Sequence, residues 1–342
     1  MASIAVIAYE TTGAVCSSMM MHADMMTEAG NDITLIISDK VDKKWFEGYS
    51  YEKVYYSTRK DLKRIVKEYF FDIIWCTNSV YVLYLFVIGI RLPICLWMQG
   101  DTPEESYMAH HSKMRRFLLQ RIVAFSFRKV AGIVYVSDAM KEYYETNYAK
   151  TPCNNIVVPC LSEFSSYNTD VKKIPDSYVY IGGLSLWQCF DEILCIYERI
   201  RTENSVLHII TLDTEKAKEK VKTMIKDDNN IEIYGITDRR RIPEILSKFQ
   251  YGFLIRKNNI VNQVSSPIKF LEYISCGVNV IMTDAVPSYA RIVDDYEIGT
   301  VVKMGGPYEL KPFSDKAKQV YKRLFDKSIY VERYKHLIKK IQ

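Results

Sequence analysis

The sequence lacks most of the features that mark a disulfide framework, a zinc site or an exported protein. Its 342 residues include eight cysteines and five histidines, but no CxxC pair. The N-terminal segment MASIAVIAYE lacks the charged start and the cleavage site of a signal peptide. We therefore expect buried, free thiols in a reducing compartment and a cytoplasmic protein, with no disulfide framework and no bound metal.

Long apolar runs and repeats are also missing. The longest apolar stretch, VYVLYLFVIGI at residues 80–90, has eleven residues, whereas a helix that spans a bilayer needs about 20. There is no low-complexity tract and no short-period repeat. The first glycine-containing turn, YETTGAV at residues 9–15, is not the GxGxxG fingerprint of nicotinamide-dependent dehydrogenases, so that class is disfavoured.

What the sequence does contain is typical of a two-domain globular protein. Hydrophobic residues make up 48% of it, with 26 Tyr and 14 Phe, which is enough to build buried cores. The length exceeds one ordinary core and favours two domains of roughly 150 to 200 residues. The net charge of +5 does not require nucleic acid as a partner, but it fits an anionic ligand or an anionic membrane surface.

Short apolar segments alternate with helical segments along the chain. Residues 3–10 and 32–38 have the unbroken apolar pattern of strands buried on both faces, and the residues between them predict a turn at Gly13 and a helix to about Thr27. Further strands are predicted at 72–78, 93–101, 131–136, 154–160, 178–183, 205–212, 231–235, 251–257, 278–284 and 298–304, and further helices at 61–70, 81–91, 112–129, 138–145, 189–201, 214–227, 238–249, 266–276 and 314–342. Such alternation predicts parallel sheets, whose ligands bind at the carboxyl ends of the strands.

Residues 161–177 are polar and aperiodic, and we interpret them as a linker. The predicted fold class is α/β, with two Rossmann-like parallel-sheet domains facing a central cleft. The predicted N-terminal domain spans residues 1–162 and the C-terminal domain residues 163–315. Residues 316–342 are predicted to form a helical tail that packs back toward the N-terminal domain.

The segment SSPIKFLEYISCGVNVIMTD, residues 265–284, has the pattern of an anion-binding helix. One of its two serines can cap the helix, and Pro267 suits the first turn, where the exposed N–H groups attract an anion. Lys269 lies in that turn, and Glu272 follows on the same face, where a carboxylate can accept two hydrogen bonds from a ribose diol. This layout suits a nucleotide diphosphate. The alternative is an ordinary Lys/Glu pair on an exposed helix.

Residues 266–281, SPIKFLEYISCGVNVI, are similar to the donor-site segment of retaining glycosyltransferases with the GT-B fold, in particular glycosyltransferase family 4, whose pattern is P-x-K-x-x-E-Y-x-A-x-G-x-P-V-I. The matching residues are Pro267, Lys269, Glu272, Tyr273, Gly277, Val280 and Ile281, with Ser275 for the usual Ala and Asn279 for the usual Pro. Residues 180–200 and 231–259 resemble the family's first C-terminal strand–loop–helix and the approach to the donor site. Residues 97–106 and 133–145 resemble members that assemble polysaccharides.

The resemblance implies a retaining, metal-independent transfer from a nucleotide-diphosphate sugar, with a uridine diphosphate sugar favoured as donor and no cofactor. Glu272 would bind the donor ribose, while Lys269 and Arg256 would contact the diphosphate and stabilise its charge as it leaves. The other donor-binding residues lie at glycine-containing turns and at the helix start: Gly13, Gly183, Gly235, Ile236, Ser265, Ser266, Pro267 and Ile268. For Arg256, the alternative is a solvated charge that closes a strand. No DxD-like motif stands at a predicted strand end, and VDDYE at 293–297 is interpreted as a loop.

Two positions depart from the family pattern. The first glutamate of the E-x7-E motif falls on Val264, which puts the usual contact with the donor sugar in doubt. The basic pair that usually follows the first C-terminal strand is absent, since residues 182–189, GGLSLWQC, supply only Gly183, Ser185 and Gln188. Lys269 and Arg256 are then the only predicted cations that would neutralise the negative charge of the diphosphate.

Polar residues lie at the carboxyl end of the predicted strand 93–101 in the N-terminal half and directly after it. The predicted acceptor-side contacts are Gln99, Gly100, Asp101, Glu104 and Glu105. The alternative is a turn before a helix whose cap is Asp101 or Thr102, with the two glutamates favouring the helix dipole.

The segment HHSKMRRFLLQRIVAFSFRK, residues 110–129, combines basic and apolar residues. Its basic residues are Lys113, Arg115, Arg116, Arg121, Arg128 and Lys129, and its apolar residues at helical spacing are Met114, Phe117, Leu118, Ile122 and Phe125. One hypothesis is a helix at the inner face of a membrane that contacts anionic lipid or a lipid-linked diphosphate. The other is a packing helix with a solvated basic face. His110 and His111 form no metal pattern and are expected at the surface.

These features predict a glycosyltransferase that acts on a glycan or lipid-linked oligosaccharide acceptor in surface polysaccharide synthesis, without a nucleic acid partner. A non-catalytic sugar-nucleotide-binding partner of another transferase stays open, because Val264 replaces an acid. A nucleotide-sugar 2-epimerase shares the architecture but needs carboxylate and histidine groups in the cleft, which five scattered histidines do not favour.

Overall fold

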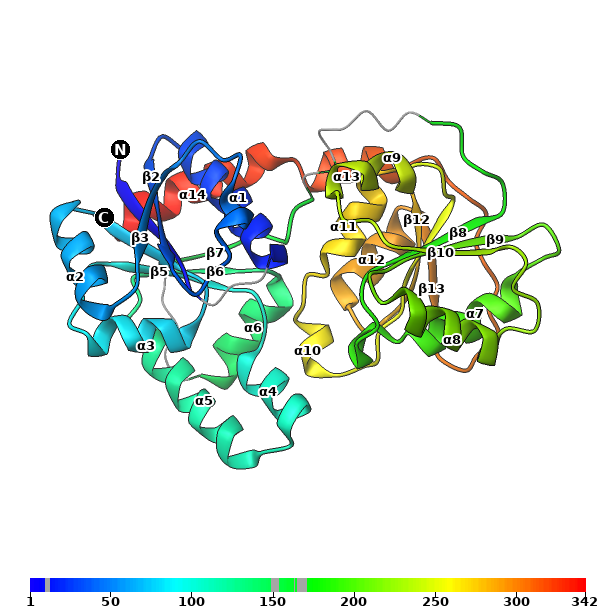
Figure 1. Cartoon of the computed structure of the whole chain (residues 1–342), viewed down its shortest axis with the longest axis horizontal. Coiled ribbons are helices and arrows are strands. Elements are labelled where there is room, and N and C mark those ends of the chain that lie inside the picture. The colour runs from blue at the N-terminus through cyan, green and yellow to red at the C-terminus, as the bar shows by residue number, and fades with distance from the viewer. Residues whose placement is uncertain (10–12, 149–153, 163, 165–170) are drawn as a thin grey trace. The chain divides into compact units, whose positions relative to one another are not determined.

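The computed structural model describes residues 1–9, 13–148, 154–162, 164 and 171–342. The chain forms two compact units, each built on its own parallel sheet (Figure 1). Unit 1 comprises Met1–Leu161, Val264–Ser266 and Asp326–Gln342, and unit 2 comprises Ser162–Gln263 and Pro267–Phe325. The predicted α/β class with two Rossmann-like parallel-sheet domains is therefore confirmed.

Unit 1 contains a seven-stranded parallel sheet of order β3-β2-β1-β4-β5-β6-β7. Its strands are β1 (Ser3–Ala8), β2 (Asp32–Ser38), β3 (Glu52–Tyr56), β4 (Ile73–Cys76), β5 (Ile94–Met98), β6 (Gly132–Tyr135) and β7 (Asn155–Val157). The direction in which the chain adds strands reverses between β1 and β4, and ligands of open α/β sheets bind at such a reversal.

The helices of unit 1 pack on this sheet or on one another. They are α1 (Gly13–Glu28), the 3-10 helix η1 (Lys43–Phe46), α2 (Arg59–Glu68), α3 (Ser79–Val87), α4 (Thr102–His110), α5 (Lys113–Phe127), α6 (Asp138–Asn147) and α14 (Lys327–Ile341). Helix α14, the last of the chain, lies beside α1 (Figure 1). His22 of α1 shares a 2.6 Å hydrogen bond with the Tyr334 hydroxyl of α14, and its burial lowers its pKa to about 3. The core of unit 1 therefore holds this histidine uncharged.

Unit 2 contains a six-stranded parallel sheet of order β10-β9-β8-β11-β12-β13. Its strands are β8 (Ser177–Ile181), β9 (Val206–Ile210), β10 (Ile231–Tyr234), β11 (Tyr251–Leu254), β12 (Asn279–Thr283) and β13 (Gly299–Val302). Its helices are η3 (Leu186–Gln188), α7 (Phe190–Ile200), α8 (Thr214–Met224), η4 (Arg239–Arg241), α9 (Ile242–Leu246), α10 (Ile260–Gln263), α11 (Ile268–Ser275), α12 (Pro287–Asp295) and α13 (Ala317–Leu324). Helices α7 and α8 cover one face of the sheet, and α9, α11 and α13 cover the other (Figure 1). The chain order reverses between β8 and β11.

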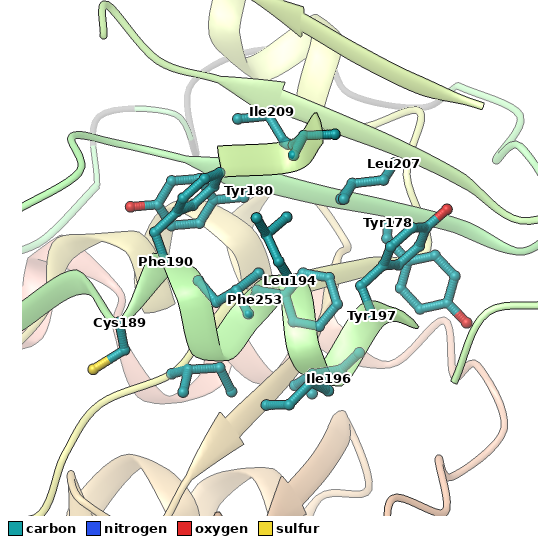
Figure 2. Close-up of a cluster of buried hydrophobic side chains, with 14 of the residues drawn as sticks. Tyr178, Tyr180, Cys189, Phe190, Leu194, Ile196, Tyr197, Leu207, Ile209 and Phe253 are labelled. Atoms are coloured by element: carbon teal, nitrogen blue, oxygen red, sulfur yellow. The ribbon is translucent and has the colours of Figure 1, made fainter. Parts of the chain in front are cut away.

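An aromatic core lies beneath β8 in unit 2. Figure 2 shows Tyr178 of β8 beside Tyr197 of α7, and the Tyr178 ring also stacks on Phe253 of β11 with the ring centres 5.9 Å apart. Leu194 and Tyr197 are three residues apart in α7, so they share the face that packs on the sheet. This packing fixes α7 against β8 and β11 of the sheet.

The structure corrects several local predictions. Strand β3 and helix α10 were not predicted, because both are short and lack a clear apolar period. Residues 293–295, interpreted as a loop, belong to α12, whose buried face includes Val293. The turn at residues 10–12 and most of the proposed linker (163 and 165–170) lie outside the described residues.

The cysteines are mostly buried, as predicted. None of the seven cysteines in the described ranges forms a disulfide, and the buried ones are Cys16, Cys76, Cys95, Cys189 and Cys276. Cys160 is half-buried, and Cys195 is exposed because it lies on the outer face of α7. Cys153 lies outside the described residues.

Candidate functional site

Two positively charged side chains are buried at the carboxyl edge of the second sheet. Arg256 follows β11, Lys269 lies in the first turn of α11, and the two residues are 7% and 9% exposed. Gln188, which ends η3 in the loop after β8, lies between them. Its Oε1 accepts hydrogen bonds from Lys269 Nζ at 2.5 Å and from Arg256 Nη1 at 2.9 Å. Since β8 and β11 flank the reversal of strand order, this cation pair lies where open sheets bind ligands.

The cation pair, Lys269 and Arg256, has no carboxylate within ion-pairing distance among the described residues. Arg256 Nη1 also donates to the Trp187 carbonyl at 2.5 Å, and Lys269 Nζ lies 4.5 Å from the ring centre of Tyr180. Burial lowers the pKa of Lys269 well below its ordinary value, the charge of Arg256 lowers it further, and Glu272 acts in the opposite direction. Burial also lowers the pKa of Arg256. Buried cations without a counterion are costly, so this site is short of negative charge.

Helix α11 begins at Ile268, two residues after its predicted start at residue 266. Pro267 occupies the N-cap position, and no side chain caps the helix. The Ser266 hydroxyl instead accepts a hydrogen bond from the Cys160 backbone N–H at 3.0 Å. The prediction that Ser265 or Ser266 caps this helix is therefore wrong, because Pro267 stands between them and the first turn. The N–H groups of that turn stay without a side-chain cap, which suits an anion.

Glu272 lies one turn beyond Lys269 and is 3% exposed. Its Oε1 accepts a hydrogen bond from Arg239 Nη2 at 2.7 Å, within an ion pair. Arg239 belongs to η4, and 46% of its side chain is exposed, so it reaches the buried carboxylate from the surface. The alternative of an ordinary exposed Lys/Glu pair is wrong, because Lys269 and Glu272 are both buried. For Arg256, the alternative of a solvated charge is wrong for the same reason.

The glycine pair after β8 leaves room for Lys269. Gly182 has a φ of +137°, and a Cβ atom added there would overlap the Lys269 ammonium group. Both the backbone and the available space therefore require glycine at this position. Gly183, the glycine predicted from the sequence, has an ordinary φ, and a Cβ atom there would lie 3.8 Å from Asp213. The sequence signal was the Gly-Gly pair, and the prediction chose its second member.

The remaining predicted donor residues are distributed over several loops. Gly235 is exposed and Ile236 is half-buried in the loop between β10 and η4. Gly13 is the first residue of α1. Ser265 and Ser266 belong to unit 1, whereas Pro267 and Ile268 belong to unit 2. Unit 2 itself therefore brings together Lys269, Arg256 and Glu272, with Gln188, Gly182 and Arg239 as additional residues.

Three carboxylates gather after β5 in unit 1. Asp101 is fully buried, its burial raises its pKa to about 6, and the Tyr144 hydroxyl donates to its Oδ1 at 3.2 Å. Glu104 is 7% exposed and forms a 2.6 Å ion pair with Arg116. Asp101 holds the N-cap position of α4, and Glu104 and Glu105 lie in its first turn, as the alternative of a turn before a helix expects. The Asp101 side chain makes no cap hydrogen bond.

The third carboxylate, Glu105, borders a cavity of 280 Å³ in unit 1. Its carboxyl group packs against Gly100, and the burial of this end raises its pKa, with a further contribution from the Asp101 charge. The other polar residues that line the cavity follow β4 and β5 or begin α4: Thr77, Asn78, Ser79, Gln99 and Thr102. Hydroxyl, amide and carboxyl groups of this kind suit a ligand rich in hydroxyl groups.

No protein-family model and no curated protein matches this sequence. Solved structures do match. AviGT4, a glycosyltransferase involved in avilamycin A biosynthesis, aligns over 100% of this chain and 98% of its own, with a TM-score of 0.62 and 12% identity. HepE from Anabaena, solved in complex with UDP and glucose, aligns over 100% and 95%, with a TM-score of 0.61 and 11% identity. The fold is that of the GT-B glycosyltransferases.

The GT-B fold does not by itself decide the reaction. A putative UDP-N-acetylglucosamine 2-epimerase from Listeria monocytogenes also aligns, over 98% of this chain and 90% of its own, with a TM-score of 0.57 and 12% identity. Likeness at such low identity establishes the fold alone, so function has to be argued from the site.

Val264 lies at the position where the resemblance expects an acid. The residue is 2% exposed, and its carbonyl accepts a hydrogen bond from the Ser137 hydroxyl at 2.6 Å. Both residues belong to unit 1. Val264 therefore serves as a buried packing residue in this GT-B chain.

The basic segment 110–129 ends α4 and forms α5. Met114, Phe117 and Leu118 share one face of α5 and are 70%, 56% and 54% exposed. The hypothesis of a packing helix therefore fails for these three residues, whereas Val123 and Phe127 near the other end of α5 are buried.

The described parts of the GT-B chain contain no helix that is both long and apolar enough to cross a membrane. Within the same residues, no group of three or more His, Cys, Asp or Glu side chains is arranged to hold a metal ion.

Proposed function

We propose that this chain is a retaining, metal-independent glycosyltransferase. It moves a sugar from a nucleotide-diphosphate sugar, with a uridine diphosphate sugar as the first candidate, to a glycan or lipid-linked oligosaccharide in surface polysaccharide synthesis. The observation that carries this proposal is the buried cation pair, which lacks a carboxylate partner among the described residues and lies one helical turn from the buried Glu272. This spacing matches a diphosphate joined to a ribose.

Each residue of the site then has a chemical task. Lys269, Arg256 and the uncapped N–H groups of α11 bind the diphosphate and offset the charge that it gains as its bond to the sugar breaks. Glu272 accepts hydrogen bonds from the ribose hydroxyl groups. The acceptor hydroxyl bonds to the same sugar carbon, and its proton passes to the departing phosphate, so no separate base is required.

The cavity beside Glu105 supports a saccharide as acceptor. Its polar lining offers hydrogen bonds to hydroxyl groups, and no lysine or arginine stands among the described residues that line it. The resemblance of residues 97–106 to polysaccharide-assembling enzymes points to the same class of acceptor. We therefore assign Gln99, Gly100 and Glu105 to the binding of the acceptor sugar, and Asp101 and Glu104 to the support of that loop.

The test is the release of nucleoside diphosphate from a panel of nucleotide sugars, with saccharide acceptors added. The Lys269→Ala and Glu272→Ala variants are expected to lose about 100-fold or more of the wild-type rate. Glu244→Ala and Lys248→Ala are matched controls, because these residues form an exposed 3.5 Å ion pair on the outside of unit 2. Equal rates in all four variants would contradict the proposed site.

The main alternative is a non-catalytic protein that binds nucleotide sugars. The observation in its favour is Val264, which is buried where the resemblance expects an acid. Tight binding of a nucleotide sugar without turnover on any acceptor would support this alternative. For an epimerase, the site offers no histidine: none of the five histidines bonds to Lys269, Arg256 or Glu272 in the described chain.

We further propose peripheral contact between α5 and an anionic membrane surface. Residues 106–129 contain six Lys or Arg residues and no Asp or Glu. The exposed apolar face of Met114, Phe117 and Leu118 lies within this basic segment. An exposed apolar face surrounded by basic residues suits the headgroup region of anionic lipids.

Co-sedimentation with vesicles tests this contact. We expect binding to vesicles of phosphatidylcholine with phosphatidylglycerol, weaker binding at high salt, and no binding to phosphatidylcholine alone. Replacing Phe117 and Leu118 together by serine should abolish binding. Val87→Ser is the control, because Val87 is 72% exposed at the end of α3. Unchanged binding of the double variant would overturn the proposal.

A further inference from the structure

The side-chain amide of Gln188 occupies the centre of the cation pair. Lys269 Nζ and Arg256 Nη1 both donate to the same atom, Gln188 Oε1, at 2.5 and 2.9 Å. Two cations that converge on one oxygen form the arrangement with which proteins bind phosphate oxygens. Here the oxygen is supplied by a neutral side chain.

An amide oxygen compensates the two charges only in part. It carries a partial negative charge, whereas a phosphate oxygen shares a full one, so each cation is attracted more strongly to a phosphate oxygen than to the amide oxygen. Lys269 and Arg256 are 9% and 7% exposed, so little water is available to make up the difference. A diphosphate would therefore compete successfully with the amide for the same two donors.

The loop that carries Gln188 allows the amide to leave. Gln188 is half-buried at the end of the short η3 helix. The two residues before it, Leu186 and Trp187, are 93% and 54% exposed. A side chain on such a surface loop can turn toward solvent without opening the core.

We propose that Gln188 Oε1 marks the position of a phosphate oxygen, and that its amide holds Lys269 and Arg256 in place until a diphosphate displaces it. Gln188 is thus a positioning residue that sets the affinity of the site for the anion. The assignment of this anion to a nucleotide sugar rests on the proposed function, whereas the exchange of amide for diphosphate does not.

Two variants separate this role from a purely structural one, with inorganic pyrophosphate as the probe. Gln188→Glu places a full negative charge between the cations, so the melting temperature should rise while the affinity for pyrophosphate falls at least tenfold. Gln188→Met removes the competing acceptor, so the variant should be less stable alone and should gain more in melting temperature than wild type when pyrophosphate is added. Asn229→Asp, which adds the same charge at an exposed position of unit 2, should leave both quantities unchanged.

If Gln188 only stabilises the fold, Gln188→Glu will raise the melting temperature and will leave the affinity for pyrophosphate equal to that of wild type. That result would overturn the proposal, as would the absence of pyrophosphate binding by wild type. Turnover of nucleotide sugars is measured separately. If Gln188→Glu lowers pyrophosphate affinity tenfold but wild type turns over no nucleotide sugar, the role of Gln188 stands and the proposed transferase activity is rejected. If wild type turns over a nucleotide sugar but Gln188→Glu keeps the wild-type affinity for pyrophosphate, the transferase activity stands and the role of Gln188 is rejected.

Discussion

At the carboxyl edge of the second sheet two cations are buried without a carboxylate partner among the described residues, whereas at the same edge of the first sheet three carboxylates gather around Asp101. Both sheets are parallel. The second reverses its strand order between β8 and β11, beside the cations, and the first reverses between β1 and β4, one strand away from the carboxylates that follow β5. The shared topology therefore decides where each charged group lies, and the residues in the loops decide whether its charge is positive or negative. A site short of negative charge suits the diphosphate, and a site rich in acceptors suits hydroxyl groups.

The largest expected effect concerns the cation pair. Lys269→Met should lower the affinity for a nucleoside diphosphate about 100-fold, because one of two charge-assisted bonds is lost in a site shielded from water. The free energy of unfolding should stay equal or rise by about 1 kcal/mol, since the variant no longer buries an ammonium group without a counterion.

Calorimetric titration and urea unfolding of the same preparation measure these two changes. Lys248→Met is the matched control, because the Lys248 side chain is 41% exposed in the same unit. A variant that loses stability and keeps its affinity would show that Lys269 is a structural residue.

The next effect concerns the glycine pair. Gly182→Ala should lower the free energy of unfolding by about 1 to 3 kcal/mol, because alanine rarely adopts a φ of +137°. It should also lower the affinity for diphosphate about tenfold, since the added methyl group displaces the Lys269 ammonium. Gly183→Ala should change neither quantity, because its φ is ordinary and the nearest atom is 3.8 Å away. Equal effects of the two substitutions would contradict this account of the turn.

The pH dependence of stability provides a test of the carboxylate group in unit 1, through Asp101. Its pKa is about 6 in the folded protein against an ordinary 3.8, so the folded state holds the proton more tightly than the unfolded state. The free energy of unfolding therefore falls as pH rises from about 4 to 6, by about 2 to 3 kcal/mol at most. Asp101→Asn removes this dependence, so the variant should gain stability relative to wild type across this window.

Urea unfolding at several pH values measures the difference between Asp101→Asn and wild type. The exposed Asp32 gives the control substitution Asp32→Asn. A difference that is constant from pH 4 to 7 would mean that Asp101 is not the group that titrates.

The smallest effect concerns Arg239, whose ion pair with Glu272 occupies the carboxylate to which we assign the ribose in our proposal. Arg239→Ala should raise the affinity for a nucleoside diphosphate about threefold, and it should leave the affinity for pyrophosphate unchanged. Arg240→Ala is the control, because Arg240 is 80% exposed and pairs with Asp238. If Arg239→Ala changes the affinities for nucleoside diphosphate and pyrophosphate equally, then Arg239 affects the binding of the diphosphate and not that of the ribose.

Much of the fold could be predicted because buried parallel strands have a plain apolar signature. Residues 32–38 were predicted as a strand and are one, and the helix with Lys269 and Glu272 begins two residues after its predicted start. Strand β3 was missed because only one of its five residues, Tyr56, is buried. The helix cap was assigned wrongly because the pattern Ser-Ser-Pro does not show that the Ser266 hydroxyl bonds to Cys160, 106 residues away in the chain.

By itself the sequence determined the alternation of strands and helices, and with it the α/β class and the edge at which open parallel sheets bind ligands, because these depend on local apolar periods and turn residues. It also pointed to Lys269, Arg256 and Glu272. Only the tertiary structure decided that these three side chains are buried, that Gln188 joins the two cations, and that Arg239 reaches Glu272. Burial and pairing depend on residues tens of positions apart, and their contacts exist only once the sheet has brought the loops after β8, β10 and β11 to one edge.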